Sequence, residues 1–203
     1  GSVPSYSSIV ATGDNTCTLH YVENRSKLKE GDLLLTDAGC EYQMYASDIT
    51  RTIPVSGKFN KEQKAIYSIV LEAQKSAIAS VKPGQTFENM QKNSIEIITL
   101  GLRKLGILKG SLVKLIKEEA YKPFYMHGIG HWLGMDVHDV GSYVNEKGKS
   151  KGFLPGMVIT VEPGIYISRN NKHVDSKWKG IGIRIEDDVL VTKSGCEVLS
   201  GKL

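Results

Sequence analysis

Four acidic residues lie within or at the ends of apolar segments of this sequence: Asp37, Asp48, Glu162 and Glu186. A charged side chain is unfavourable there, because burying a lone carboxylate costs several kcal/mol unless a cation or a metal ion pairs with it. If the four converge with an imidazole from His131 or a neighbouring histidine, their combined charge of about −4 cannot stay buried unpaired. Two divalent cations would neutralise it.

The ligand types of such a cluster limit the metal and its chemistry. Oxygen-rich sites with a single nitrogen ligand favour Mn²⁺, Fe²⁺ or Co²⁺ over the zinc of thiolate sites. Two metal ions that share bridging carboxylates hold a hydroxide at neutral pH and polarise a carbonyl, which predicts hydrolysis. Spacing along the chain does not by itself establish that the carboxylates converge.

The two aspartates also have plainer interpretations. Asp37 ends an apolar run that begins at Leu33, so it could open a turn before Gly39. Asp48 could form a salt bridge with Arg51. The spacing favours a functional role, because Asp48 follows Asp37 by eleven residues. A hairpin of that length would place the two carboxylates side by side.

The two glutamates stand at the ends of apolar strands. Glu162 ends the strand predicted over residues 157–162, directly before Pro163. Arg184 and Glu186 share one face of the strand predicted over residues 181–186. An exposed ion pair between them would contribute at most about 1 kcal/mol. A strand this apolar rarely has one face fully open to solvent, which favours burial of the pair.

Three of the five histidines fall within twelve residues: His127, His131 and His138. Gly128 and Gly130 disfavour a helix here, so we expect an extended segment with His127 and His131 on one face. The glycines would also let the backbone approach a ligand closely. The chain has no His-Glu-x-x-His pattern, which excludes a zincin-type helix site.

Strands, then helices, then strands follow one another along the chain, an order typical of an α+β fold. Asn60 and Gln63 have the spacing of a capping box, Thr86 is a second helix cap, and Gly106 is a helix stop. The predicted helices cover residues 61–81, 86–106 and 112–120. The predicted strands lie within residues 7–13 and 33–55 and over residues 157–162, 181–186 and 189–192.

Length and composition indicate an ordinary globular chain of one domain. It has 203 residues, 40% of them hydrophobic, and a net charge of 26 − 22 = +4. The lysines are spread along the chain, so we expect no nucleic-acid partner. No apolar run reaches the roughly 20 residues of a membrane-spanning helix. Three distant cysteines exclude a disulfide framework and favour a reducing, cytoplasmic compartment.

Five motifs in order resemble the catalytic domain of aminopeptidase P, a member of the pita-bread (M24) metallopeptidases, and together they run through almost the whole chain. They are Leu19-His20-Tyr21; Asp37-Ala-Gly with Ser47-Asp48-Ile-Thr-Arg-Thr; the segment from His127-Gly-Ile-Gly-His131-Trp to His138-Asp; Val161-Glu162-Pro-Gly-Ile-Tyr166; and Gly182-Ile-Arg184-Ile-Glu186-Asp.

The resemblance implies a curved antiparallel sheet covered by helices and assigns a role to ten residues. The metal ligands would be Asp37, Asp48, His131, Glu162 and Glu186, holding two divalent ions, most plausibly Mn²⁺, with Co²⁺, Zn²⁺ or Fe²⁺ as alternatives. Asp48 and Glu186 would bridge the ions, and Glu162 would take the proton of the bridging water. The catalytic and substrate-binding residues would be His20, His127 and His138, supported by Arg184 and Tyr166.

The implied activity is release of the residue before an N-terminal proline, with a proline-containing peptide as substrate. Prolidase, which cleaves Xaa-Pro dipeptides, is the alternative, and Trp132 favours the aminopeptidase because prolidases tend to carry phenylalanine there. An inactive peptide-binding module is a further alternative, and the intact ligand set argues against it. We expect residues 1–203 to form one catalytic domain without the family's N-terminal domain and first helices. We also expect the parent protein to be a homo-oligomer, cytoplasmic or mitochondrial.

Overall fold

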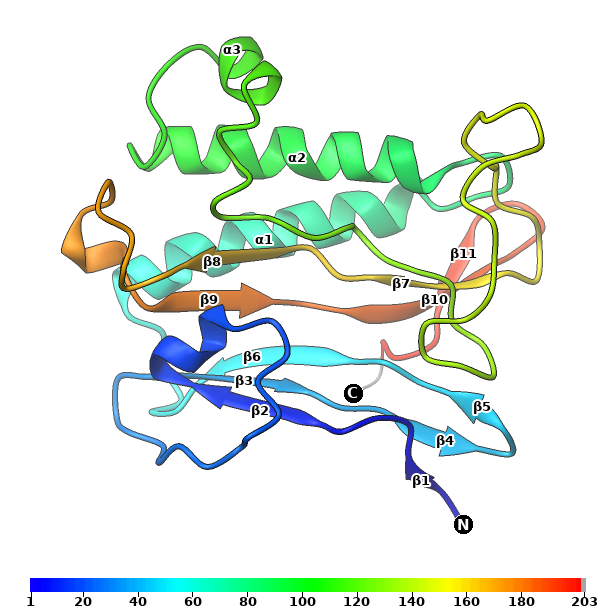
Figure 1. Ribbon diagram of the computed structural model, residues 1–203, viewed down its shortest axis with the longest axis horizontal. Coiled ribbons are helices and arrows are strands. Elements are labelled where there is room, and N and C mark those ends of the chain that lie inside the picture. Colours follow the sequence, from blue (N-terminus) through cyan, green and yellow to red (C-terminus); the bar gives the residue numbers. More distant parts are fainter. Residues whose placement is uncertain (202–203) are drawn as a thin grey trace.

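Three helices lie along one side of a layer of short antiparallel strands in the computed structural model of this chain, which describes residues 1–201 (Figure 1). The helices are α1 (Lys61–Ser80), α2 (Phe87–Lys104) and α3 (Leu112–Lys117). Strands precede and follow them in the sequence, so the predicted α+β order is confirmed. No helix within residues 1–201 combines the length and apolar composition that crossing a membrane requires.

The strands form four small sheets, and every pairing is antiparallel. The first half of the chain supplies β2 (Ile9–Thr12), β3 (Leu33–Asp37) and β6 (Thr50–Pro54), and also β1 (Val3–Pro4), β4 (Cys40–Tyr42) and β5 (Tyr45–Ala46). The second half supplies β11 (Cys196–Val198), β10 (Asp187–Val191) and β7 (Val158–Val161), and the pair β8 (Gly164–Ile167) and β9 (Ile181–Arg184). Two 3₁₀ turns, Gly13–Cys17 and Ser176–Trp178, complete the set.

Side chains and backbone groups of β6 join the two halves of the strand layer. The Thr52 hydroxyl donates to the Arg184 carbonyl at 2.9 Å and accepts from the Arg184 amide at 3.2 Å. The Glu186 amide donates to the Thr50 carbonyl at 3.1 Å. These bonds hold β6 beside β9 and the start of β10, so residues more than 130 positions apart share one surface.

The apolar face of α1 covers the strands. Ile66, Val70 and Ala73 pack into a core with Ile183 and its neighbours, while Ala77 belongs to a second core around β7 and β10. These α1 residues recur at helical spacing and are fully buried. Burial of that face therefore fixes α1 across the back of the sheets, opposite the candidate site.

The predicted helix caps are confirmed, and the three helices end one to three residues earlier than expected. Asn60 and Gln63 form the capping box, and Thr86 caps α2. The third helix was expected to reach Ala120, but it ends at Lys117. Glu119 has a φ of 53°, a left-handed conformation that a continuing helix cannot contain.

The strand predicted over residues 181–186 ends two residues early, and the strand predicted over residues 189–192 begins two residues early. β9 ends at Arg184 and β10 begins at Asp187, with Glu186 between them. The opposing segment is divided as well, because Pro163 separates β7 from β8 and has no amide proton to donate. β9 pairs with β8, whereas β10, which follows it, pairs with β7. Glu186 lies at that change of partner.

The capping box gives a prediction about stability. Replacing Asn60 with alanine should lower the free energy of unfolding by about 1 kcal/mol, because the amide of Gln63 loses its acceptor. Asn60→Ser should retain most of the stability, since serine is an equally good cap. Urea denaturation of both variants would test this, and equal losses for alanine and serine would contradict it.

Candidate active site

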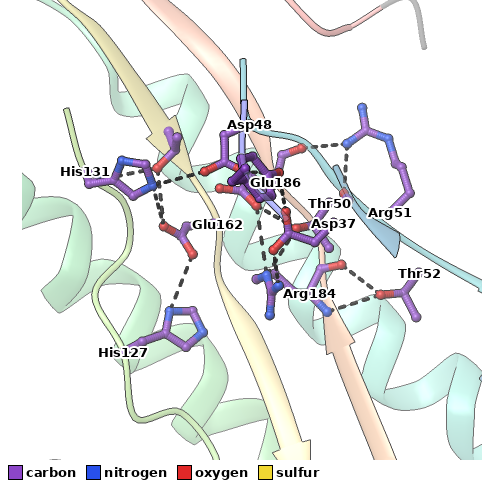
Figure 2. A network of polar contacts seen from close by, with 12 residues as sticks. Asp37, Asp48, Thr50, Arg51, Thr52, His127, His131, Glu162, Arg184 and Glu186 are labelled. Carbon is purple, nitrogen blue, oxygen red and sulfur yellow. Dashed lines mark hydrogen bonds and ion pairs between the residues drawn. The ribbon is translucent and has the colours of Figure 1, made fainter. Parts of the chain in front are cut away.

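One cavity of about 610 Å³ collects almost all of the predicted site residues. Its wall includes all five predicted metal ligands, the three predicted catalytic histidines and Arg184: Asp37, Asp48, His131, Glu162, Glu186, His20, His127 and His138. They come from the segment after the first 3₁₀ turn, the end of β3, the loop before β6, the segment 127–138, the residue after β7 and the junction of β9 and β10. Figure 2 shows the inner part of this cluster.

Asp37 and Asp48 lie side by side, as the hairpin argument predicts. Asp37 is opposite Thr50 in the register of β3 and β6, and the β4–β5 hairpin fills the gap between the two aspartates. The Tyr6 hydroxyl contacts Oδ1 of Asp37 at 2.5 Å and Oδ1 of Asp48 at 2.6 Å. Both aspartates are buried. β3 does end at Asp37, as the plainer interpretation expected, but the carboxylate is buried and bound by Tyr6 and Arg184.

Arg184 is the cation beside the first aspartate. Its Nη2 donates to Oδ2 of Asp37 at 2.5 Å, and its Nε donates to the Thr50 hydroxyl at 3.1 Å. That hydroxyl in turn donates to Oε2 of Glu186 at 2.6 Å. Arg184 and Glu186 are 4% and 2% exposed, so the interpretation as an exposed ion pair is wrong. The chain from Arg184 through Thr50 orients Glu186 toward the cavity.

His131 presents one free ring nitrogen to the carboxylates. Its Nδ1 lies 2.9 Å from the Trp132 carbonyl, which can only accept, so the proton is on Nδ1. Nε2 faces Asp48 at 3.4 Å and Glu162 at 3.5 Å, and in the neutral ring it carries the lone pair that could bind a metal. In the metal-free protein the contact with Asp48 outweighs burial and raises the pKa of His131. A backbone carbonyl that fixes the tautomer in this way is a common support for a metal-binding histidine.

The segment around His131 is extended, as predicted, because it pairs with β7. The amide of Thr160 donates to the His131 carbonyl at 3.0 Å, and that of Glu162 donates to the Ile129 carbonyl at 2.8 Å. Gly130 allows this approach, since a Cβ there would lie 2.0 Å from the Thr160 carbonyl oxygen. The pairing places His131 and Glu162 on the same wall of the cavity.

His127 lies on the same side of the segment and faces Glu162 at 3.8 Å. Its Nε2 is 2.9 Å from the Tyr166 hydroxyl, which also accepts from Nη1 of Arg184 at 3.1 Å. Tyr166 is fully buried behind His127 and does not line the cavity. It therefore contacts two predicted site residues without facing the space where a substrate would bind.

The two remaining histidines lie at the rim of the cavity. His20 follows the first 3₁₀ turn, and His138 packs edge-to-face against His131 with 4.3 Å between ring centroids. Both are exposed. Proximity to His131 and partial burial lower the pKa of His138, with burial the larger cause. Both rings are therefore available to a molecule that enters from solvent.

Crowded carboxylates have raised pKa values, as electrostatics requires. Burial, with repulsion from Asp48 and Asp37, raises the pKa of Glu162 to about 7, against the pull of His131 and Arg184. Burial and the neighbouring carboxylates also raise the pKa of Glu186. The pKa of Asp48 is lowered, because hydrogen bonds from His131 and Tyr6 outweigh its burial.

This donor set fits divalent metal ions. Ligand atoms of Asp48, His131 and Glu186 lie within 4.8 Å of one another, and Asp37 and Glu162 line the same cavity. A set of four carboxylates with one imidazole nitrogen suits oxygen-preferring divalent ions. Burial, together with repulsion between the carboxylates, raises the pKa values of three of these carboxyl groups, and divalent ions would neutralise the negative charge that they share.

Several supporting residues were not expected from the sequence. Tyr6 bridges two aspartates, and Thr50 connects Arg184 with Glu186. Arg51, proposed as a partner of Asp48, instead pairs with Asp187 at 2.7 Å and donates to the Glu186 carbonyl at 2.6 Å. The alternation of β6 could have indicated Thr50, whereas Tyr6 lies outside any strand and carries no sequence signal.

The chain matches known proteins along its length. A model of metallopeptidase family M24 matches residues 1–193. The Xaa-Pro aminopeptidase of Haemophilus influenzae is 56% identical over 97% of this chain, and that of Escherichia coli is 50% identical over 98%. This chain spans 45% of the length of each of these relatives.

Solved structures agree with the sequence matches. Aminopeptidase PepP of Pseudomonas aeruginosa superimposes with a TM-score of 0.95 at 56% identity, covering 97% of this chain and 44% of that one. Proline aminopeptidase P II of Yersinia pestis has a TM-score of 0.94 at 50% identity, covering 98% of this chain and 45% of that one. The predicted fold of curved antiparallel strands covered by helices is confirmed.

The raised pKa of Glu162 predicts a pH dependence of stability in metal-free protein. The folded state retains a proton on Glu162 up to about pH 7, whereas the unfolded chain releases it near 4.5. Stability therefore falls as pH rises through this window, by roughly 2–3 kcal/mol between pH 5 and 8.

Urea denaturation with a chelator present would measure the slope. Glu162→Gln should show a smaller decrease over the same range, because the amide does not titrate. Mn²⁺ added at pH 8 should restore stability to the unmodified chain. An equal slope in the variant would show that other groups cause the decrease.

Proposed function

This chain belongs to metallopeptidase family M24, and on that premise we propose that it carries the hydrolytic site of an Xaa-Pro aminopeptidase. The substrate would be a peptide with proline at its second position, and the bond cleaved would be the one before that proline. The proposal covers activity and substrate for the parent protein, because the chain spans 45% of its curated relatives.

The observation that carries the proposal is the convergence of Asp48, His131 and Glu186 on one point of a histidine-lined cavity. Residues of these types, buried and within 4.8 Å of one another, make a costly arrangement without a cation. The names of the relatives, Xaa-Pro aminopeptidases at 50% and 56% identity, supply the substrate class.

We propose that Asp37, Asp48, His131, Glu162 and Glu186 would hold two divalent ions, preferentially Mn²⁺. Such a pair of ions supplies an activated water molecule and polarises the carbonyl of the bond to be cleaved. Arg184 would keep Asp37 in place from behind, through the 2.5 Å bond to Oδ2. The positions of the ligand side chains would then be determined by the strands as well as by the ions.

Glu162 is placed to move a proton. Its carboxyl group faces the cavity and would accept a proton from the activated water and later release it. The leaving group is the proline nitrogen, which carries no hydrogen in the peptide bond and must gain one on cleavage. Glu162 lies between His127 and His131 in the cavity wall, where both reacting groups could reach it (Figure 2).

The histidines outside the ligand set would bind the peptide. His20 and His138 stand at the rim, and His127 stands deeper beside Glu162. Imidazole N–H groups can donate to substrate carbonyls and stabilise the negative charge that develops on the carbonyl oxygen. Burial lowers the pKa of His127 to about 4, so its ring is neutral, and its single N–H, on Nδ1, faces the Gly128 carbonyl at 2.8 Å. Donation to a substrate would require that bond to be exchanged.

Trp132 bears on the alternative, a prolidase acting on dipeptides. The Trp132 ring packs against Phe87 and Phe153 in the core, and the residue does not line the catalytic cavity. It would therefore distinguish the two groups of enzymes without contacting the substrate. Selection of tripeptides over dipeptides has to be measured directly.

We also propose that residues 1–203 form one catalytic domain of the parent protein. We propose that the parent protein assembles into a homo-oligomer and lies in the cytoplasm or in mitochondria.

The decisive experiment is mass spectrometry of one mixture containing an Xaa-Pro-Xaa tripeptide and an Xaa-Pro dipeptide. Protein stripped with a chelator should cleave neither, and after reloading with Mn²⁺ it should release the first residue of the tripeptide only. Cleavage of the dipeptide alone would identify a prolidase. Cleavage of neither substrate would contradict activity in this chain.

Ligand variants would connect that activity to the site. His131→Ala and Glu186→Gln should reduce Mn²⁺ affinity by 10-fold or more, measured by calorimetry, and remove most activity. A matched control is His173→Ala, because this histidine is exposed and does not line the cavity. Unchanged Mn²⁺ affinity in both ligand variants would contradict the metal assignment.

A further inference from the structure

We propose that Gln91 on α2, together with Tyr125, is a positioning residue for His127. This inference rests on the proposed function, because it assigns the two residues to the same reaction. They would act through His127, by fixing its main chain and ring, and would not themselves touch the substrate.

His127 needs support from outside its own segment. The pairing of this segment with β7 reaches Ile129, whose carbonyl accepts from the Glu162 amide, and His127 lies beyond that bond. Gly128 and Gly130 follow it, and glycine restrains the backbone least of all residues. Without a further contact, the His127 backbone would be held only by its neighbours in the chain.

Gln91 makes that contact from α2. Its Nε2 donates to the His127 carbonyl at 3.3 Å, and its Oε1 accepts from the Tyr125 hydroxyl at 3.2 Å. A carbonyl can only accept, so it selects the amide nitrogen of Gln91 and leaves the amide oxygen for Tyr125. Both polar ends of the Gln91 side chain therefore form hydrogen bonds with the segment that carries His127.

Tyr125 closes the arrangement from the other side. It is 1% exposed, and its ring packs edge-to-face against His127 with centroids 5.1 Å apart and planes at 86°. Its hydroxyl is bound to Gln91, which is bound to the His127 main chain. The three residues thus form a closed circuit, in which the ring and the backbone of His127 are restrained together.

Tyr166 restrains the opposite edge of the ring through the 2.9 Å contact to Nε2. Tyr166 fixes the orientation of the His127 ring, whereas Gln91 fixes the position of the His127 main chain relative to Glu162. A catalytic group displaced by about 1 Å can lose 10²-fold in rate. Loss of the Gln91 contact should therefore reduce the turnover rate by a larger factor than it reduces the equilibrium constant for folding.

The test compares Gln91→Met with Asn93→Leu in the Mn²⁺-loaded chain. Methionine keeps the length of Gln91 and removes both polar ends. Asn93 is the matched control, because it lies on the same helix and its amide donates to Ser76 on α1, away from the cavity. We expect kcat/KM for the tripeptide to fall roughly 10-fold or more in Gln91→Met and to stay within 2-fold in Asn93→Leu.

Two further measurements separate positioning from general destabilisation. Thermal unfolding should show similar midpoints for the two variants. The ¹⁵N resonances of the His127 ring, recorded on metal-free protein because Mn²⁺ is paramagnetic, should shift in Gln91→Met and not in Asn93→Leu. Tyr125→Phe keeps the ring contact and removes the hydroxyl, so it should lose less activity than Gln91→Met.

The outcomes distinguish this inference from the proposed function. If the unmodified chain cleaves no peptide, the proposed function fails, while the His127 resonances still report whether Gln91 positions this residue. Unchanged kinetic constants or unchanged His127 resonances in folded Gln91→Met would overturn the inference. If Gln91→Met does not fold, wild-type resonances in Tyr125→Phe would overturn it as well.

Discussion

Mutual repulsion among buried carboxylates is the constraint on which the rest of this structure depends. Asp37, Asp48, Glu162 and Glu186 share one cavity, and Arg184 offsets only part of their charge. Burial and this repulsion together raise the pKa values of Glu162 and Glu186. A fold that holds such groups together without divalent ions must keep protons on some of them, and this connects metal binding to folding.

The strand layer withstands that repulsion because the ligands stand where the strands end or change partner. Asp37 is the last residue of β3, Glu162 follows β7, and Glu186 separates β9 from β10. At such points the backbone is still held by a ladder on one side, while the side chain is free to turn into the cavity. The backbone bonds between β6 and Glu186 then fix the relative position of the two halves.

Both charged and neutral groups form hydrogen bonds to the site residues from outside the cavity. Arg184 bonds to Asp37 directly and reaches Glu186 through the Thr50 hydroxyl. The histidines also have neutral partners: His131 has the Trp132 carbonyl, and His127 has Tyr166. Burial lowers the pKa of His127 and keeps its ring neutral, whereas in the metal-free protein the contact with Asp48 outweighs burial and raises the pKa of His131.

Much of this protein is determined by local sequence. The capping box at Asn60, the periodic apolar face of α1 and the alternation in β3 and β6 follow from contacts between near neighbours, and the structure confirms them. The residue types of the candidate ligands and the glycines around His131 were equally evident. Their order along the chain was sufficient to indicate the family.

Only the tertiary structure decided which partners these residues have. Arg184 pairs with Asp37 across 147 positions of the chain, Arg51 turns to Asp187 rather than Asp48, and Tyr6 joins two aspartates from outside any strand. Periodicity reports which face a side chain occupies, because that depends on the local backbone. Which distant group meets it depends on how the sheets pack, and that is settled by the burial of α1 and by the change of strand partner at Pro163.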